Sequence, residues 1–196
     1  MEIQILKYPH PTLRHKSKPV TRIDRQLKKW VEEMFELMYA TEGIGLASNQ
    51  VDLPYQLFVL NVTGDRTKTE EERVILNPVI HRRKESAEDL EGCLSFPGIT
   101  ANVVRPAIIE FEGIALNGET QIFKFDGLIA RAVQHEMDHL NGCCFVDRLT
   151  PSELATIRPE LDELTSEYES KCRLWFIPSE KEVLERLVAL EKERSR

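Results

Sequence analysis

Apolar residues recur at spacings of three and four across residues 24–42, as on the buried face of an amphipathic helix. Gly43 follows as its expected stop. A second helix is predicted after an Asp-Gly pair, over 128–140 (LIARAVQHEMDHL), with Asn-Gly at 141–142 as its end. The apolar face of the first helix consists of Leu27, Trp30, Val31, Met34 and Met38.

Four segments rich in β-branched and aromatic residues are predicted as strands: 56–62, 74–80, the stretch around 107–111, and 121–125. Asn117-Gly118 marks the turn before the last of them. The strands and helices do not alternate regularly. We therefore expect an α+β fold of mostly antiparallel strands packed around the helix at 128–140.

The chain changes character after Leu149. Apolar residues at helical spacing continue, but Pro159 should kink or restart the helix. Ser179 followed by Glu182 forms a capping-box pattern before a last amphipathic run. We predict one domain over 1–149 and a helical C-terminal extension over 150–196, which packs on the domain or on a partner.

The 196 residues include 41% hydrophobic and 30% charged positions, as in an ordinary globular protein. The net charge of −7 argues against a sequence-specific or general nucleic-acid binder, which needs a basic face. No apolar run is long enough to span a bilayer, and residues 1–15 lack the pattern of a secretory signal. We expect a cytoplasmic protein that makes no membrane contact. The sequence does not indicate its oligomeric state.

The pentapeptide His135-Glu136-Met137-Asp138-His139 is the strongest local indication of chemistry. Two histidines four residues apart lie on one face of a helix, so their imidazoles can bind one metal ion. Glu136 then lies close enough to take a proton from an activated water. The neighbouring helix residues are apolar, so these histidines are expected to be partly buried. The alternative is a chance match on a surface helix.

A catalytic metal site needs a third protein ligand and one open position. Cys93 is the best candidate because it follows a glycine, which lets the backbone turn tightly and a ligand approach. Without further information, burial is the favoured interpretation for any of the four cysteines, Cys93, Cys143, Cys144 and Cys172. The small residues of 43–50 suit a backbone that lies against a peptide-like ligand, or simply a helix end and a turn.

Three segments together resemble motifs of the peptide deformylases, in the same order. They are GIGLASNQ at 43–50, EGCLS at 91–95 and QHEMDHLNG at 134–142, and the resemblance covers about residues 1–149. It implies removal of the N-formyl group from the initiator methionine of newly made chains, with release of formate. N-formylmethionyl peptides would be the substrates, and the ribosome near its exit tunnel is a further expected partner.

The resemblance also implies roles for individual residues. One divalent ion, usually Fe²⁺ with Zn²⁺, Ni²⁺ or Co²⁺ as substitutes, would be held by Cys93, His135 and His139. Glu136 would be the general acid and base, and Gln50 and the backbone N–H of Leu94 would donate to the oxyanion. An ion pair of Arg105 with Glu91 would support the site, although Arg105 could equally be a surface charge. The methionine pocket would be formed by Gly43, Ile44, Gly45, Leu128, Arg131 and Ala132. All of these could instead be plain core residues. If Arg131 lines the pocket, its aliphatic stem would form the wall and its guanidinium would reach solvent.

Three residues depart from the family's usual pattern. Ser48 and Asn49 replace the common Ala-Pro before the glutamine, so loop geometry or substrate preference could differ. Thr100 stands where many members have a basic residue, which puts a charged contact to the substrate in doubt.

Two other functions stay open. A zinc endopeptidase would take its third ligand downstream of the helix, from Glu153, Glu160 or Glu163. A metal-holding or ribosome-associated module without catalysis would explain the altered first motif and the long tail.

Overall fold

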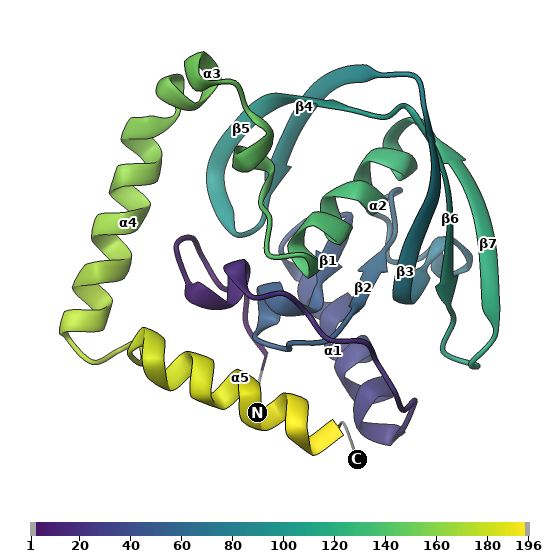
Figure 1. Cartoon of the computed structure of the whole chain (residues 1–196), viewed down its shortest axis with the longest axis horizontal. Coiled ribbons are helices and arrows are strands. Elements are labelled where there is room, and N and C mark those ends of the chain that lie inside the picture. The colour runs from purple at the N-terminus through teal and green to yellow at the C-terminus, as the bar shows by residue number, and fades with distance from the viewer. Residues whose placement is uncertain (1–2, 195–196) are drawn as a thin grey trace.

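The computed structural model describes residues 3–194, and its largest sheet has five strands in the order β1-β2-β3-β6-β7 (Figure 1). Every neighbouring pair is antiparallel, as expected from the sequence. The four predicted strands are confirmed, whereas the three-residue β1 is too short for its pattern to show. The strands are β1 Gly45–Ala47, β2 Leu57–Leu60, β3 Arg73–Lys84, β6 Ile108–Ile114 and β7 Thr120–Asp126.

A second sheet of two strands was not predicted. It consists of β4 Ala87–Cys93 and β5 Phe96–Arg105, paired antiparallel with Gly92 opposite Thr100. Most residues of β4 are exposed, and its buried member is the polar Glu91, so its sequence lacks the apolar alternation of a half-buried strand. Gly92 was expected to let the backbone turn tightly beside Cys93. It lies within β4, and the chain reverses in the turn that follows Cys93.

Helix α1, Arg25–Ala40, confirms the first predicted helix. The Asp24 carboxylate accepts a hydrogen bond from the Leu27 N–H at 2.9 Å, which caps the helix start. Its end differs from the expectation: Thr41 is the C-cap and Glu42 has the left-handed φ of 56°. Gly43 follows, and its N–H donates to the Met38 carbonyl.

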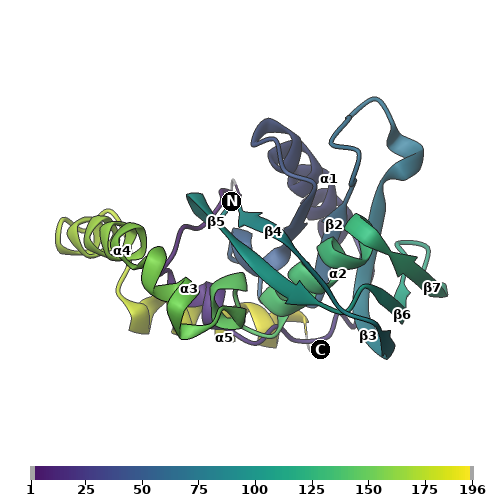
Figure 2. The ribbon, with the colours of Figure 1, turned by 90° about the horizontal axis from the view of Figure 1, so that it is seen from above.

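The five-stranded sheet has helices on both faces, which explains why β2 is buried throughout. Leu57 and Val59 belong to the apolar cluster that contains the inner face of α1. Phe58 and Leu60 alternate with them and join the cluster of α2, Gly127–Leu140. Helix α2 lies between this sheet and the β4–β5 sheet (Figures 1 and 2). The predicted fold class, α+β with a central helix, is confirmed.

The tail is helical, as predicted. Helix α3 spans Pro151–Thr156 and α4 spans Arg158–Arg173, with Pro159 in the first turn of α4 where a proline is tolerated. Helix α5, Glu180–Arg194, follows the predicted cap, in which the Glu182 carboxylate accepts from the Ser179 N–H at 2.8 Å. Helix α4 lies to one side of the sheets (Figure 2), whereas α5 runs back below the domain in Figure 1, and its Arg194 lies over the ring of Trp30 in α1.

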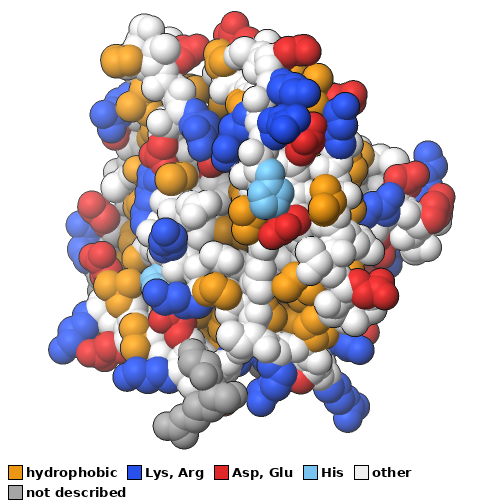
Figure 3. All heavy atoms as spheres, turned by 45° about the vertical axis from the view of Figure 1, so that its right-hand side comes forward, with side chains coloured by type: hydrophobic (Ala, Val, Ile, Leu, Met, Phe, Trp, Pro, Cys, Tyr) orange, Lys and Arg blue, Asp and Glu red, His pale blue; other side chains and the backbone are white. Residues whose placement is uncertain are grey.

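The face around β3, β6 and β7 carries both signs of charge (Figure 3). Cross-strand ion pairs lie on it, such as Arg82 with Glu110 and His81 with Glu112. Basic and acidic side chains are interspersed on this face rather than gathered into one basic patch (Figure 3). None of the helices within residues 3–194 combines the length and apolar character that a membrane crossing requires.

Candidate metal centre

Three potential metal ligands converge from two elements. Cys93 ends β4, and His135 and His139 lie one turn apart on α2. Their ligand atoms all lie within 4.8 Å of one another, and Cys93 Sγ is 3.2 Å from His139 Nε2. Within residues 3–194 this is the one group of at least three such side chains close enough to share an ion. The sequence prediction that Cys93 joins the two histidines is therefore matched in space.

The chemistry of these donors fits a divalent ion. A thiolate with two imidazoles is a three-ligand set that leaves one tetrahedral position open. Burial lowers the pKa of His139 well below its usual value. His139 therefore remains neutral, as a metal ligand must be.

Glu91 orients the His135 ring. Its Oε2 lies 3.1 Å from His135 Nδ1, which leaves the other ring nitrogen for an ion. Burial alone would raise the pKa of the Glu91 carboxyl, but hydrogen bonds from His135 and Arg105 outweigh it and lower the pKa to about 2. The predicted pair with Arg105 is present, with N–O distances of 2.6 and 2.8 Å. Arg105 is only 2% exposed, so it is not a surface charge.

Glu136 is buried beside the ligands, against β1. A Cβ placed on Gly45 would lie 2.5 Å from Glu136 Oε1, so only glycine leaves the carboxylate room there. Glu136 Oε2 has no hydrogen-bond partner among the described residues. Burial raises the pKa of Glu136 to about 7, against the opposing charges of His135 and Arg105. A carboxyl with such a pKa can both accept and donate a proton near neutrality.

Gln50 brings an amide group to the same place. It lies in the short 3-10 helix Ser48–Val51 that follows β1. Its Oε1 accepts from the Ala47 N–H at 2.8 Å, which aims Nε2 toward Cys93 Sγ, 3.4 Å away, and toward Ser95 Oγ at 3.2 Å. Leu94 follows Cys93 in the turn between β4 and β5.

A cavity of about 700 Å³ opens at these residues. Its lining includes Cys93, His135, Glu136, Gln50 and Leu94, and also the predicted methionine-pocket residues Gly43, Ile44, Gly45, Leu128, Arg131 and Ala132. His139 is the predicted site residue that is absent from this lining, because it lies fully buried behind the others.

The expected exposure of the Arg131 head is wrong. Its guanidinium donates to Glu91 Oε1 at 2.6 Å and to the carbonyls of Val103 and Ala87, each at 2.8 Å. The β4–β5 sheet covers this part of α2, and that sheet was not predicted.

The three departures from the family pattern have defined surroundings. Ser48 Oγ donates to the Tyr55 carbonyl, and the Asn49 amide donates to the carbonyl of His139. Both side chains are buried, so their polar groups hold backbone rather than substrate. Thr100 is exposed at the cavity and brings no charge to it.

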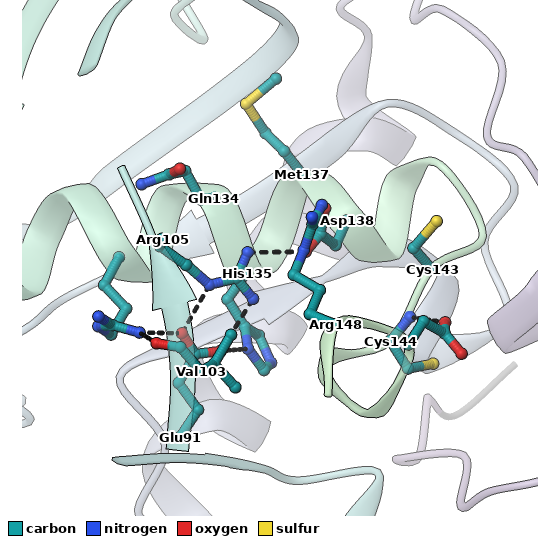
Figure 4. A network of polar contacts seen from close by, with 12 residues as sticks. Glu91, Val103, Arg105, Gln134, His135, Met137, Asp138, Cys143, Cys144 and Arg148 are labelled. Atoms are coloured by element: carbon teal, nitrogen blue, oxygen red, sulfur yellow. Dashed lines mark hydrogen bonds and ion pairs between the residues drawn. The ribbon is translucent and has the colours of Figure 1, made fainter. Parts of the chain in front are cut away.

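Other residues at the site were not predicted. Ile5 and Lys7 line the cavity from the extended N-terminal segment, and Phe96 and Ile99 line it from β5. Asp138 contacts Arg105 at 2.7 Å and also pairs with Arg148 (Figure 4). No sequence pattern marked this contact, because Asp138 is one of several polar residues on α2.

The comparison with known proteins agrees with these motifs. The family described as polypeptide deformylase matches residues 3–155. A peptide deformylase of Rhodopirellula baltica is 47% identical over 171 residues, which cover 87% of this chain and 85% of the relative. Peptide deformylase 1B of Arabidopsis thaliana, named as chloroplastic or mitochondrial, is 43% identical over 88% of this chain, which spans 63% of that protein.

A solved structure of Plasmodium falciparum peptide deformylase superposes with a TM-score of 0.83 at 40% identity. The match covers 85% of this chain and 98% of that one. The fold, the family match and the relatives agree: the chain belongs to the peptide deformylase family, whose enzymes remove the N-formyl group from nascent polypeptides.

Proposed function

We propose that this chain deformylates the initiator methionine with one divalent ion held by Cys93, His135 and His139, and with Glu136 moving the proton. The observation that carries the proposal is the convergence of these ligand atoms within 4.8 Å, at a cavity that Glu136 also lines. A metal centre beside a buried carboxyl and an amide donor matches what amide hydrolysis requires.

The side chains divide the work. A bound divalent ion would supply Lewis-acid activation of water and of the formyl carbonyl. Glu136, unpartnered at Oε2, accepts a proton from the water and passes it to the leaving amine. Gln50 Nε2 and the backbone N–H of Leu94 donate to the formyl oxygen as negative charge gathers there. Losing one such donor costs on the order of a hundredfold in rate.

The methionine side chain enters the cavity between the 43–45 segment and α2. Ile44, Leu128 and Ala132 supply apolar contact, and the absence of side chains at Gly43 and Gly45 lets the peptide lie against the backbone. The Arg131 head bonds to Glu91 and two carbonyls, so this arginine contributes its aliphatic stem to the pocket.

Fe²⁺ is the ion we propose, with Zn²⁺, Ni²⁺ or Co²⁺ as substitutes, since imidazole and thiolate donors accept all four. Metal-free protein reconstituted with Fe²⁺ without oxygen should release formate and lose this activity after peroxide treatment. Activity that survives peroxide unchanged would instead point to zinc or another redox-quiet ion.

A cytoplasmic location and a partnership with the ribosome belong to the same proposal. All four cysteines are free, as expected in a reducing compartment. The substrate, a nascent chain, is available where it emerges from the ribosome. Co-sedimentation with ribosomes would test this part.

Cys93→Ala, with Cys143→Ala as its control, tests the ligand set. Cys143 is also a free, partly exposed cysteine, and it lies outside the ligand group. We expect Cys93→Ala to lose the metal and formate release from a formyl-Met peptide, and Cys143→Ala to keep both. Retained metal and activity in Cys93→Ala would contradict the proposed ligand set.

A further inference from the structure

Five charged side chains that alternate in sign form a series along α2, and Figure 4 labels four of them, Glu91, Arg105, Asp138 and Arg148. We call them the charge chain; in order they are Arg131, Glu91, Arg105, Asp138 and Arg148. Arg131 and Arg105 both contact Glu91 Oε1 at 2.6 Å, and Arg105 reaches Asp138 Oδ2 at 2.7 Å. Arg148 closes the series with hydrogen bonds to both Asp138 oxygens.

The first four members of the charge chain are withdrawn from water. Their side chains are between 2% and 11% exposed, and only Arg148, at 44%, reaches solvent. Buried guanidinium and carboxylate groups are retained only where their partners are well placed, so the position of each member depends on its neighbour. Hydrogen bonds with Asp138 raise the pKa of Arg148, in keeping with a firmly held pair.

The charge chain connects the elements that carry the proposed metal ligands. Glu91 is two residues before Cys93 on β4, while Asp138 lies on α2 between His135 and His139. Arg105, on β5, is bonded to both carboxylates. The distance from the thiol to the imidazoles therefore depends on how β4 is held against α2. Arg105 cross-links the two elements through Glu91 and Asp138, beside the direct contact of Arg131 with Glu91.

Asp138 and Arg148 lie outside the lining of the cavity, so neither can touch a substrate there. Asp138 nevertheless fixes the far end of Arg105, and Arg148, from the 3-10 helix Phe145–Arg148, fixes Asp138 with a two-pronged contact. Through Arg105 and Glu91 the contact continues to His135 Nδ1, at 3.1 Å from Glu91 Oε2.

We propose that Asp138 and Arg148 are positioning residues for the metal centre, acting through Arg105 and Glu91 on the placement of His135 relative to Cys93. The inference rests on the proposed ligand set. It predicts that changes at these two residues alter metal affinity and coordination geometry, and lower kcat with little change in KM.

The test is Co²⁺ binding to metal-free protein, followed by absorption spectroscopy. Arg148→Met and Asp138→Asn should weaken Co²⁺ binding by about tenfold, as loss of partners behind metal ligands commonly does, and shift the cobalt bands. Arg14→Met is the control. Arg14 pairs with Asp147, the neighbour of Arg148, and its side chain is 42% exposed, close to the 44% of Arg148.

The control should keep Co²⁺ affinity within about twofold and leave the spectrum unchanged, because its pair lies outside the charge chain. Wild-type affinity and spectrum in both Arg148→Met and Asp138→Asn would overturn the proposal, even if both lower the thermal midpoint of the metal-free protein. If neither variant folds, Arg148→Lys is the deciding variant. Lysine keeps the positive charge but cannot make the two parallel hydrogen bonds of a guanidinium to Asp138, and an unchanged cobalt spectrum would overturn the proposal.

These readouts need no turnover. A wild-type protein that binds Co²⁺ but releases no formate would contradict the proposed function and leave the positioning role standing. Loss of Co²⁺ binding in the wild type would instead contradict the ligand set on which both rest.

Discussion

Glu136 shows how packing prepares a single side chain for chemistry. The residue is buried, one of its oxygens is unpartnered, and burial raises its pKa to about 7. An ordinary stabilising carboxylate would be fully bonded at such a position. The space that it occupies depends on Gly45 in β1, which brings the backbone within van der Waals reach of the carboxylate.

Gly45→Ala should therefore act on catalysis more than on metal binding. The added methyl would lie 2.5 Å from Glu136 Oε1 and 2.8 Å from Leu60 Cδ2, so the carboxylate must move. A displacement of about 1 Å in a catalytic group can cost about a hundredfold in rate. We expect kcat for formate release to fall by about that factor with metal content unchanged. A kcat within about threefold of wild type would show that Glu136 does not need this placement.

The charge on Glu91 makes stability depend on pH. Its pKa is about 2 in the folded protein against an ordinary 4.5, so its contribution to stability is complete above about pH 4.5 and is lost as the pH falls toward 2. Linkage gives a loss of about 2 kcal/mol between pH 6 and pH 3. Glu91→Gln lacks this titration.

Denaturant unfolding of the metal-free proteins measures the effect. Wild type should have a higher free energy of unfolding than Glu91→Gln. This difference between the two proteins should be about 2 kcal/mol smaller at pH 3 than at pH 6. A difference that does not change with pH would mean that Glu91 is not held as a carboxylate by its neighbours.

Sequence patterns predict that two residues lie together when they are close in the sequence. His135, Glu136 and His139 could be placed together because helical spacing alone brings them to one side of α2. The contact of Arg131 with Glu91 joins residues 40 positions apart, and no periodicity reports it. The expectation that this arginine reaches solvent failed for that reason.

Among the elements, α1 and α2 were predictable from apolar residues at helical spacing, and the four longer strands of the main sheet from runs of β-branched and aromatic residues. The β4–β5 sheet was not, although it carries Cys93 and covers Arg131. Its stability depends on buried charge and on a few apolar residues such as Phe96 and Val103, rather than on an alternating pattern. The part of the fold that completes the site was therefore the least visible in the sequence.

Helix α4 contributes a buried side chain to the apolar cluster of the β4–β5 sheet. Leu161 is 4% exposed and lies in the same apolar cluster as Phe96 and Ile99, which line the cavity. Leu161→Ala should lower the free energy of unfolding by about 2–5 kcal/mol, as loss of a buried leucine does. Leu174→Ala, at the end of the same helix and 61% exposed, is the matched control and should change it by less than about 0.5 kcal/mol. Equal effects in a urea titration would mean that α4 does not share this core.

At the scale of the whole molecule, the tail folds back onto the N-terminal half. The Tyr55 hydroxyl donates to the Leu190 carbonyl at 2.7 Å, and the Arg194 guanidinium lies 5.1 Å from the ring centre of Trp30. A division at residue 149 stays a prediction. The sequence indicated helices in the tail, but only the three-dimensional structure showed which surfaces they cover, because such contacts join residues far apart in the chain.

In the proposed reaction, a buried carboxyl moves the proton at a three-ligand metal centre. The most direct test of this step is formate release from a formyl-Met peptide by wild type and Glu136→Gln, both with one metal ion bound. Wild type should turn over, and the variant should keep its metal but lose at least about a hundredfold in kcat, within the range for a general acid and base. Full activity in the variant, or no formate from metal-loaded wild type, would contradict the account.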